Sequence, residues 1–323
     1  MIPDRDRYLG ALVGLAVGDA LGAPLEFTQR DAAPAVTGMR GGGKFDLKPG
    51  QWTDDTSMAL CIASSLIETG TFDLRDQLDR FLRWRDEGYL TSRGKCFGIG
   101  QQTFWALSDF TKSGTVTRNS SRRWRAGNGS LMRLAPVPMV FAHDLDLAAC
   151  ASGVSSLTTH PVTECREACA TYGRLIAGAL RGWERDEILA EGQRLAGGAS
   201  SEPLRAVLSG AYLQKSRDEI SSSGYVIATM EAALWAFAHA ADFESGALMA
   251  VNLGHDADTV GAVYGQLAGA HFGYSDIPTA WIVQLFDREG IVTIATALHG
   301  QMSKIEVAPE TARLLDDATS RRR

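Results

Sequence analysis

The chain carries no surplus of positive charge. Its 32 lysines and arginines are outnumbered by 38 aspartates and glutamates, which gives a formal net charge of -6 and a pI near 5.6. A nucleic-acid-binding surface needs an excess of lysine and arginine, because binding depends on displacing counterions from the phosphate backbone. The composition therefore argues against direct nucleic-acid binding and is typical of an acidic cytoplasmic protein.

Long apolar runs are also missing. No run reaches the roughly 18 apolar residues that cross a bilayer, and the opening MIPDRDRYLG has no signal-peptide pattern. The apolar segment from Arg7 to Gly22 is short and contains Asp19, which argues against a membrane helix. We therefore expect a soluble protein that is neither exported nor bound to a membrane.

The cysteines form no recognisable metal or redox motif. Their number is odd and their spacing matches neither pattern, with residues at 61, 96, 150, 165 and 169. Cys165 and Cys169 lie one helical turn apart within an apolar pattern. We therefore expect buried thiols in a reducing compartment.

No segment alternates polar and apolar residues in the way that predicts a strand. Helical periodicity instead marks four segments, which are Thr56 to Gly70, Phe72 to Gly88, Val162 to Trp183 and Ala228 to Ala241. The chain is long enough for two domains. The loops between these helices are left to carry function.

Glycine repeats at every fourth position near both ends of the chain, at residues 10, 14, 18 and 22 and at residues 261, 265, 269 and 273. This spacing keeps the glycines on one helix face. Each glycine weakens a helix by roughly 1 kcal/mol relative to alanine, so close packing must offset the loss. We predict that the two helices pack together, which brings both ends of the chain into one all-α domain.

Two pairs of aspartates stand at predicted helix starts. Each pair is accompanied by a threonine, and the two sets are Thr53, Asp54 and Asp55, and Asp256, Asp258 and Thr259. An ordinary N-cap is the alternative for each motif alone, but a cap needs only one carboxylate. Four converging carboxylates would repel each other unless cations lay between them. Oxygen ligands without a histidine or cysteine cluster favour magnesium or manganese.

Three loops and one turn are further candidates for function. The segment from Ala23 to Gln51 begins near Glu26 and is long and rich in proline and glycine, which is typical of a mobile lid that orders on ligand binding. The loop RAGNGSLMR precedes an apolar run, so a helix N-terminus there could bind phosphate; an ordinary turn with Ser130 as N-cap is the alternative. Gly98 and Gly100 precede another helix, and His160 lies at a turn.

Together these motifs resemble the ADP-ribosylglycohydrolase family. The segments that carry the resemblance are GLAVGDALGAPLEF, WTDDTSMAL, GNGSLMR, SLTTHP, GYVIATMEAALWAF and NLGHDADTVGAVYGQLAGA. It implies a compact all-helical domain over residues 1–310, with two magnesium or manganese ions in a central cleft. Residues 311–323 would then form a polar, flexible tail.

The resemblance also implies roles for individual residues. The metal ligands would be Thr53, Asp54, Asp55, Asp256, Asp258 and Thr259. Asp55 and Asp256 would also take part in catalysis with Glu26, which matches a glutamate in a mobile loop above the metals. The residues expected to bind ADP-ribose are Gly98, Gly100, Gly127, Asn128, Gly129, Ser130 and His160, with Trp124 a candidate for stacking on adenine.

The activity implied is hydrolysis of the glycosidic bond between ADP-ribose and a protein side chain, with arginine as the first expectation. Two metals would hold the ribose hydroxyls and ionise a water while positive charge builds up on the ribose ring. Glu26 would act as a general acid or base, or as a gate. The alternatives are another linkage (serine, poly(ADP-ribose) or O-acetyl-ADP-ribose), a non-catalytic ADP-ribose binder, and a magnesium-dependent phosphohydrolase.

One position departs from the family pattern. Arginine-directed bacterial members are associated with Phe-Asp-Ile-Gly, whereas this chain has glycine at position 98 between Phe97 and Ile99. A cationic leaving group thereby loses a carboxylate partner. We therefore expect Gly98→Asp to raise activity on ADP-ribosyl-arginine more than on ADP-ribosyl-serine.

Overall fold

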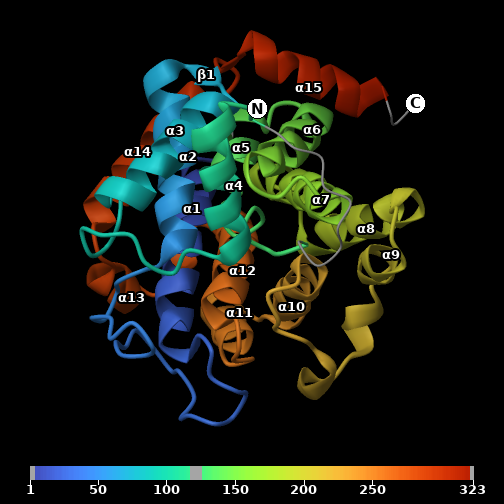
Figure 1. The fold of residues 1–323 in the computed structure, drawn as a ribbon. Helices are drawn as coiled ribbons and strands as arrows, with labels where there is room; N and C mark the ends of the chain where they lie inside the picture. Colours follow the sequence, from blue (N-terminus) through green and yellow to red (C-terminus); the bar gives the residue numbers. More distant parts are fainter. Residues whose placement is uncertain (1–3, 117–125, 321–323) are drawn as a thin grey trace.

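The computed structural model describes residues 4–116 and 126–320 of the chain. In these residues the chain folds into fifteen α-helices, joined by turns and short 3-10 helices (Figure 1). One sheet is present there, made of two two-residue strands. The prediction of an all-α fold is confirmed.

Six of the fifteen helices lie in the first half of the chain. They are α1 (Arg5–Gly22), α2 (Asp54–Thr69), α3 (Leu74–Glu87), α4 (Gln101–Ser113), α5 (Pro136–Phe141) and α6 (Leu145–Ser155). The helices of the second half are α7 (Thr163–Leu180), α8 (Arg185–Leu195), α9 (Glu202–Leu208), α10 (Val226–His239), α11 (Phe243–Val251), α12 (Ala257–Phe272), α13 (Thr279–Gln284), α14 (Arg288–Gln301) and α15 (Pro309–Ser320). The four helical segments predicted from periodicity are all confirmed.

Helices α1 and α12 run antiparallel at the centre of the fold and touch through their glycines. A Cβ atom on Gly10 would lie 2.1 Å from the carbonyl oxygen of Gly269. One on Gly18 would lie 2.0 Å from the carbonyl oxygen of Gly261. Any side chain would push the two backbones apart, so glycine is required at these contacts. The predicted packing of the two ends of the chain is confirmed.

Helix α1 is also a long, apolar helix of the core. The helical stretch Arg5–Leu25 has a mean hydropathy of 1.5, and by length and composition it could cross a membrane. The apolar window of this stretch is 100% buried within the protein, where α2, α7, α12 and α14 pack around it. Its apolar composition therefore serves the core.

The C-terminal segment closes back onto the first half of the chain. Strand β1 (Thr71–Phe72) pairs in parallel with β2 (Glu306–Val307). Helix α15 then packs against α6, and the hydroxyl of Thr311 accepts a hydrogen bond from the Leu74 backbone N–H. The domain end expected at residue 310 thus falls inside a helix, and residues 311–320 do not form a loose tail.

The loop between α1 and α2 contains a short 3-10 helix (Ala23–Leu25) and an isolated bridge between Gly42 and Leu47. It is attached to the rest of the protein at several points along its length. The N–H of Phe27 donates to the carbonyl of His255, and the side chain of Asn252 bonds both backbone groups of Val36. The mobility of this loop stays a prediction, and these anchors limit which part of it could move.

Candidate active site

The N-terminal ends of α2 and α12 meet beside the C-terminal part of α1. One carboxylate oxygen from each of Asp19, Asp55 and Asp258 lies within 4.8 Å of the others. Glu26, four residues past the end of α1, forms a second such group with Asp256 and Asp258. Because Asp258 belongs to both groups, they form one continuous feature, here called the carboxylate cluster. Its members, with Asp54 added, are Asp19, Glu26, Asp54, Asp55, Asp256 and Asp258.

Asp19 organises the start of α2 from a different helix. Its carboxylate accepts hydrogen bonds from the backbone N–H groups of Thr53 and Thr56, at 2.9 and 3.0 Å. It also accepts from their hydroxyls, at 3.0 and 2.6 Å. Burial raises the pKa of Asp19 to about 6, while these bonds lower it. Asp19 therefore caps α2 across the helix interface, which leaves Asp54 and Asp55 free of that task.

The side chain of Asp256 is not engaged in capping α12. Asp256 occupies the N-cap position, but its carboxylate makes no cap hydrogen bond. It instead accepts a bond of 2.6 Å from the amide of Asn128, which also donates to the hydroxyl of Thr229. Thr53, at the N-cap position of α2, likewise makes no side-chain cap bond. The ordinary-cap alternative therefore describes neither aspartate motif.

The carboxyl groups of the cluster are forced together in a buried place. Burial, followed by the charges of its neighbours, raises the pKa of Asp54, Asp55 and Asp258 well above the usual range. Burial raises the pKa of Glu26 to about 11, with Asp258 the next contributor. A cation placed between these groups would reverse the shifts, because it stabilises the ionised forms.

Three oxygens of the cluster lack hydrogen-bond partners among the described residues. They are Oε2 of Glu26, Oδ1 of Asp55 and Oδ1 of Asp258, and all three are buried. A buried polar atom without a partner is unfavourable, and a hard divalent cation coordinates such oxygens. The hydroxyl of Thr53 lies 3.2 Å from Asp55 and 3.4 Å from Asp258. The cluster could therefore hold a metal ion.

The glycine loop before α4 lies directly over Asp54. Gly98 has a φ of 78°, and a Cβ atom there would lie 2.4 Å from Oδ1 of Asp54. The loop therefore approaches the carboxylate cluster closely because Gly98 has no side chain. Gly100 is the N-cap residue of α4 and provides no side-chain cap, so the first N–H groups of that helix lack a side-chain partner.

The loop from Gly127 to Ser130 forms a turn. Gly127 pairs with Tyr225 in an isolated bridge, and the next helix, α5, begins only at residue 136. The prediction of a helix N-terminus here is wrong. The Ser130 hydroxyl is buried, where it bonds the Ser156 hydroxyl at 2.8 Å and accepts from the Cys169 thiol. The alternative of a turn is correct, although Ser130 caps no helix.

His160 is held in one orientation by a chain of buried hydrogen bonds. Arg133 donates to the hydroxyl of Thr159 at 2.7 Å, and that hydroxyl lies 2.7 Å from Nδ1 of His160. Since arginine only donates, the Thr159 hydroxyl accepts there, and Nδ1 is the acceptor within hydrogen-bond distance of its own hydrogen. Burial lowers the pKa of His160 to about 3, so the ring is neutral. A hydrogen bond from Thr159 to Nδ1 corresponds to the tautomer that carries its proton on Nε2. Nε2 lies on the side of Gly127 and Gly129.

The comparison with known proteins decides the family. The family model described as ADP-ribosylglycohydrolase matches residues 2–307. The chain belongs to the ADP-ribosylglycohydrolase family. It is 41% identical to an ADP-ribosylarginine hydrolase of Serratia proteamaculans, over 92% of this chain and 81% of that protein. It is 35% identical to the ADP-ribosyl-[dinitrogen reductase] glycohydrolase of Rhodospirillum rubrum, over 87% and 90% of the two chains.

A solved structure shares the fold as well as the sequence. It is named ADP-ribosylglycohydrolase-related protein complex, and it superposes with a TM-score of 0.81 at 43% identity. The match covers 92% of this chain and 98% of the other. The protein is therefore an enzyme of the ADP-ribosylglycohydrolase type, and the resemblance noted in its motifs is confirmed.

Sequence reasoning did not assign a site role to Asp19 or to Arg133. Asp19 could have been noticed because it is a charged residue in an otherwise apolar, glycine-rich helix. Arg133 closes the RAGNGSLMR motif and is 1% exposed, where it stacks on Phe81 with 4.6 Å between Cζ and the ring centroid. Trp124, proposed for adenine stacking, lies in residues 117–125, outside the described residues.

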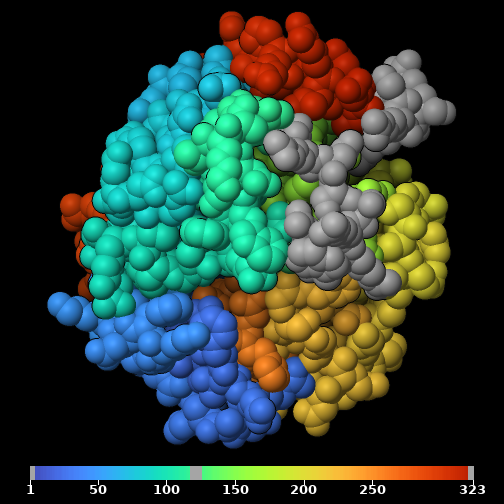
Figure 2. Space-filling model, viewed as in Figure 1, coloured from blue at the N-terminus to red at the C-terminus, as the bar shows by residue number. Residues whose placement is uncertain are grey.

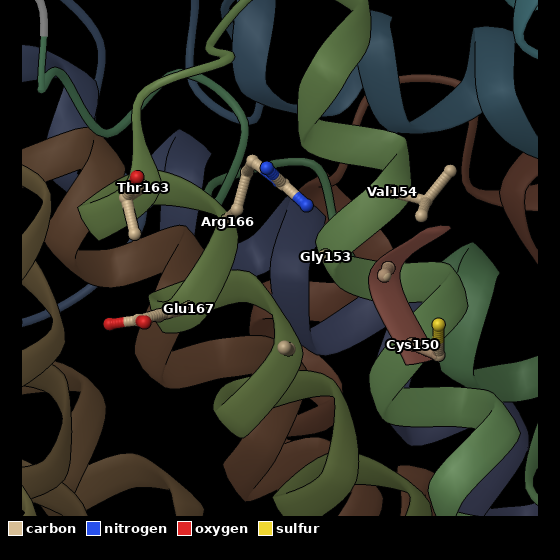
Figure 3. Close-up of a pocket in the computed structure, with 8 residues that line it drawn as sticks. Cys150, Gly153, Val154, Thr163, Arg166 and Glu167 are labelled. Carbon is tan, nitrogen blue, oxygen red and sulfur yellow. The ribbon is translucent and has the colours of Figure 1, made fainter. Parts of the chain in front are cut away.

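Two cavities lie on a different part of this glycohydrolase. One of about 190 Å³ is lined by residues of α6, α7 and α15, among them Cys150 and Val154 of α6 and Thr163 and Glu167 of α7 (Figure 3). A neighbouring cavity of about 560 Å³ is lined by residues of α6 to α9. Neither is lined by a residue of the carboxylate cluster, so the reaction is expected elsewhere. Figure 2 shows one face of the molecule. On this face the N-terminal segment (blue), α4 (blue-green) and the segment that precedes α10 (yellow) meet around atoms of the α11–α12 region (orange).

Proposed function

We propose that the protein hydrolyses the bond between ADP-ribose and an arginine side chain of a modified protein. The observation that carries this proposal is the carboxylate cluster, with its two three-carboxylate groups that share Asp258. The relatives that are 41% and 40% identical are both named ADP-ribosylarginine hydrolase, which supports arginine as the linkage. The expected product is free ADP-ribose.

The cluster would hold two magnesium or manganese ions. The proposed ligands are Thr53, Asp54, Asp55, Asp256, Asp258 and Thr259, as the resemblance implies. The three partnerless buried oxygens support this assignment, and two of them belong to Asp55 and Asp258. Bound metal would orient the ribose hydroxyls and lower the pKa of a water at the anomeric carbon. Asp19 would contribute by fixing the first turn of α2 rather than as a free ligand, because four donors already occupy its oxygens.

Glu26 is the proposed proton-transfer residue. It is 8% exposed, and its Oε2 has no hydrogen-bond partner among the described residues. It stands where the loop leaves the cluster, so its carboxylate could take a proton from the attacking water at Oε2. Asp55 and Asp256 would support the same step by holding the ions that orient this water.

The diphosphate of ADP-ribose is proposed to lie between the start of α4 and His160. The N-terminus of α4 offers N–H groups to an anion, and its Gly100 adds no side chain that would block access. Gln102 in its first turn donates to the carbonyl of Thr159, which fixes α4 beside His160. The Nε2–H of His160 adds a neutral donor on the side of Gly127 and Gly129. Ser130 is left with a supporting role because its hydroxyl bonds to buried groups.

A second linkage remains a candidate because of Gly98. Without a carboxylate at this position, the loop offers no ionic partner to a guanidinium, whereas an ADP-ribosyl-serine substrate needs none. The two candidates share the ADP-ribose site and the carboxylate cluster, and they differ only in the leaving group.

A substrate panel tests the proposal. The protein and magnesium are incubated with ADP-ribosyl-arginine, ADP-ribosyl-serine, poly(ADP-ribose) and a simple phosphate ester, and the free ADP-ribose and inorganic phosphate released are measured. We expect release of ADP-ribose mainly from ADP-ribosyl-arginine. Release only from the serine linkage would support the second candidate, and hydrolysis of the phosphate ester alone would contradict both.

A further inference from the structure

Three phenylalanine rings form a chain of contacts, and two of them belong to residues that adjoin Glu26 and Gly98 in the sequence. Phe27 follows Glu26 in the chain, and Phe97 precedes Gly98, whose backbone lies against Asp54. Phe45 connects them, with ring centroids 6.3 Å from Phe27 and 5.3 Å from Phe97, both in edge-to-face contact. These three residues are here called the aromatic rim.

The backbone conformation of Phe27 is unusual for a residue whose only role is to stabilise the fold. Its backbone has a φ of 62°, a left-handed conformation that is unfavourable for a bulky side chain. Its ring is 60% exposed, so little buried surface offsets this strain. A hydrogen bond of 2.7 Å to the carbonyl of His255 holds the backbone in place beside the Asp256 motif. The arrangement favours a role for the exposed ring in binding.

The rim already attracts cations from the protein itself. The ammonium of Lys44 lies 4.0 Å from the centroid of the Phe27 ring. The guanidinium carbon of Arg93 lies 5.4 Å from the centroid of Phe97. Both cationic residues are exposed, although Arg93 also donates to the carbonyl of Phe45, so an incoming cation would displace surface side chains and not the core.

We propose that the aromatic rim recognises the guanidinium of the target arginine and the start of its aliphatic chain. This inference rests on the proposed cleavage of ADP-ribosyl-arginine. A planar, delocalised guanidinium stacks well on aromatic faces. Since Gly98 supplies no carboxylate, the rings of Phe27 and Phe97 would provide the cation-binding surface beside Glu26 and Gly98. A serine leaving group has no charge to recognise and gains nothing from the rim.

The test compares Phe27→Leu, Phe97→Leu and the double variant on two substrates. Leucine keeps an apolar side chain but removes the π face. For each single variant we expect kcat/KM on ADP-ribosyl-arginine to fall about two- to tenfold, and for the double variant about five- to thirtyfold. On ADP-ribosyl-serine the change stays within about twofold, and the Kd for free ADP-ribose, measured by calorimetry, does not move. Phe27→Tyr, which keeps the ring, should retain arginine activity.

Phe286→Leu is the matched control. Phe286 is 43% exposed, and its ring packs on Trp52 outside the rim. It should leave the ratio of arginine to serine activity unchanged. Equal losses on both substrates, or no loss in the double variant, would overturn the rim assignment while leaving the arginine linkage intact. If the unmodified protein released no ADP-ribose from arginine, the proposed function itself would fail, and the rim assignment with it.

Discussion

The carboxylate of Asp19 on α1 accepts the backbone N–H of Thr56 on α2 at 3.0 Å and its hydroxyl at 2.6 Å. A helix start is usually capped by a residue next to it in sequence, whereas here the cap comes from a neighbouring helix. Asp54 and Asp55 therefore stand in the first turn of α2 with their carboxylates available for other contacts. The glycine contacts between α1 and α12 hold Asp19 within reach, so the core helix pair also shapes the site.

Replacing Asp19 tests this arrangement. Asp19→Asn keeps the size but places an amide donor against groups that already donate. We expect the free energy of unfolding at pH 8 to fall by about 3 kcal/mol, since buried hydrogen bonds to a charged acceptor are lost. Urea titration followed by circular dichroism measures it. Asp6→Asn on the same helix is the control; Asp6 is half-buried there and accepts a hydrogen bond from the Ser275 hydroxyl near the surface, so a change below about 1 kcal/mol is expected. Equal effects would argue against the capping role.

Removing an aspartate of the predicted metal set separates activity from folding. We expect Asp55→Ala and Asp256→Ala each to abolish release of ADP-ribose at saturating magnesium. The protein should stay folded, because each change relieves repulsion among buried carboxylates and lowers metal affinity more than stability. Activity assays and thermal melts without metal check this pair of outcomes. Full turnover in either variant would refute the metal-site assignment.

The orientation of His160 depends on the Thr159 hydroxyl. Thr159→Val keeps the shape but removes the hydrogen donated to Nδ1, so Nε2 no longer needs to carry the ring proton. We expect KM to rise about tenfold, because the substrate loses roughly one hydrogen bond from Nε2 of His160. The value of kcat should change little. Thr159→Ser should restore the wild-type KM.

The position of the ring proton of His160 can also be measured by spectroscopy. In the wild type, nitrogen-15 NMR at pH 6 should show His160 neutral and protonated on Nε2, because its pKa is lowered to about 3. In Thr159→Val the signals should shift toward a mixture of the two neutral forms. Identical spectra for the two proteins would contradict the chain from Arg133 to His160.

The structure reverses the earlier expectation for Gly98. Any Cβ at this left-handed position would meet the Asp54 carboxylate at 2.4 Å, so Gly98→Asp would displace a proposed ligand and add a like charge beside it. We now expect activity on every ADP-ribosyl linkage to fall, and Gly98→Ala to lower kcat/KM about tenfold or more. Gly300→Ala on α14, where a Cβ meets nothing within 4 Å, is the control. Wild-type rates for Gly98→Ala would show that the loop can shift freely.

Much of the architecture could be predicted from local pattern. The spacing of glycines in the sequence predicts that α1 and α12 pack together, because only a close approach of two backbones explains four glycines on one helix face. The paired aspartates predict a carboxylate cluster, since a helix cap needs one carboxylate and each of the two motifs supplies two. Helix boundaries such as Asp73 and Gly88 around α3 also follow from ordinary capping chemistry.

The remaining features depend on contacts between distant segments. Asp19 meets Thr53 and Thr56 only because two helices cross at that point, and no local pattern records the crossing. The apolar run after Gly129 suggested a helix start, whereas the bridge from Gly127 to Tyr225 holds the chain in a turn. The clash that makes glycine necessary at position 98 likewise arises from the fold.

Metal removal tests the central claim most directly. The purified protein is treated with a chelator, dialysed, and assayed on ADP-ribosyl-arginine before and after addition of magnesium or manganese, with Asp258→Asn run in parallel. Asp258 belongs to both three-carboxylate groups, so its loss should weaken both ion positions. We predict that the stripped wild type is inactive and regains release of ADP-ribose on metal addition, while Asp258→Asn stays inactive. Undiminished hydrolysis by the stripped protein would contradict a metal-dependent reaction at the carboxylate cluster.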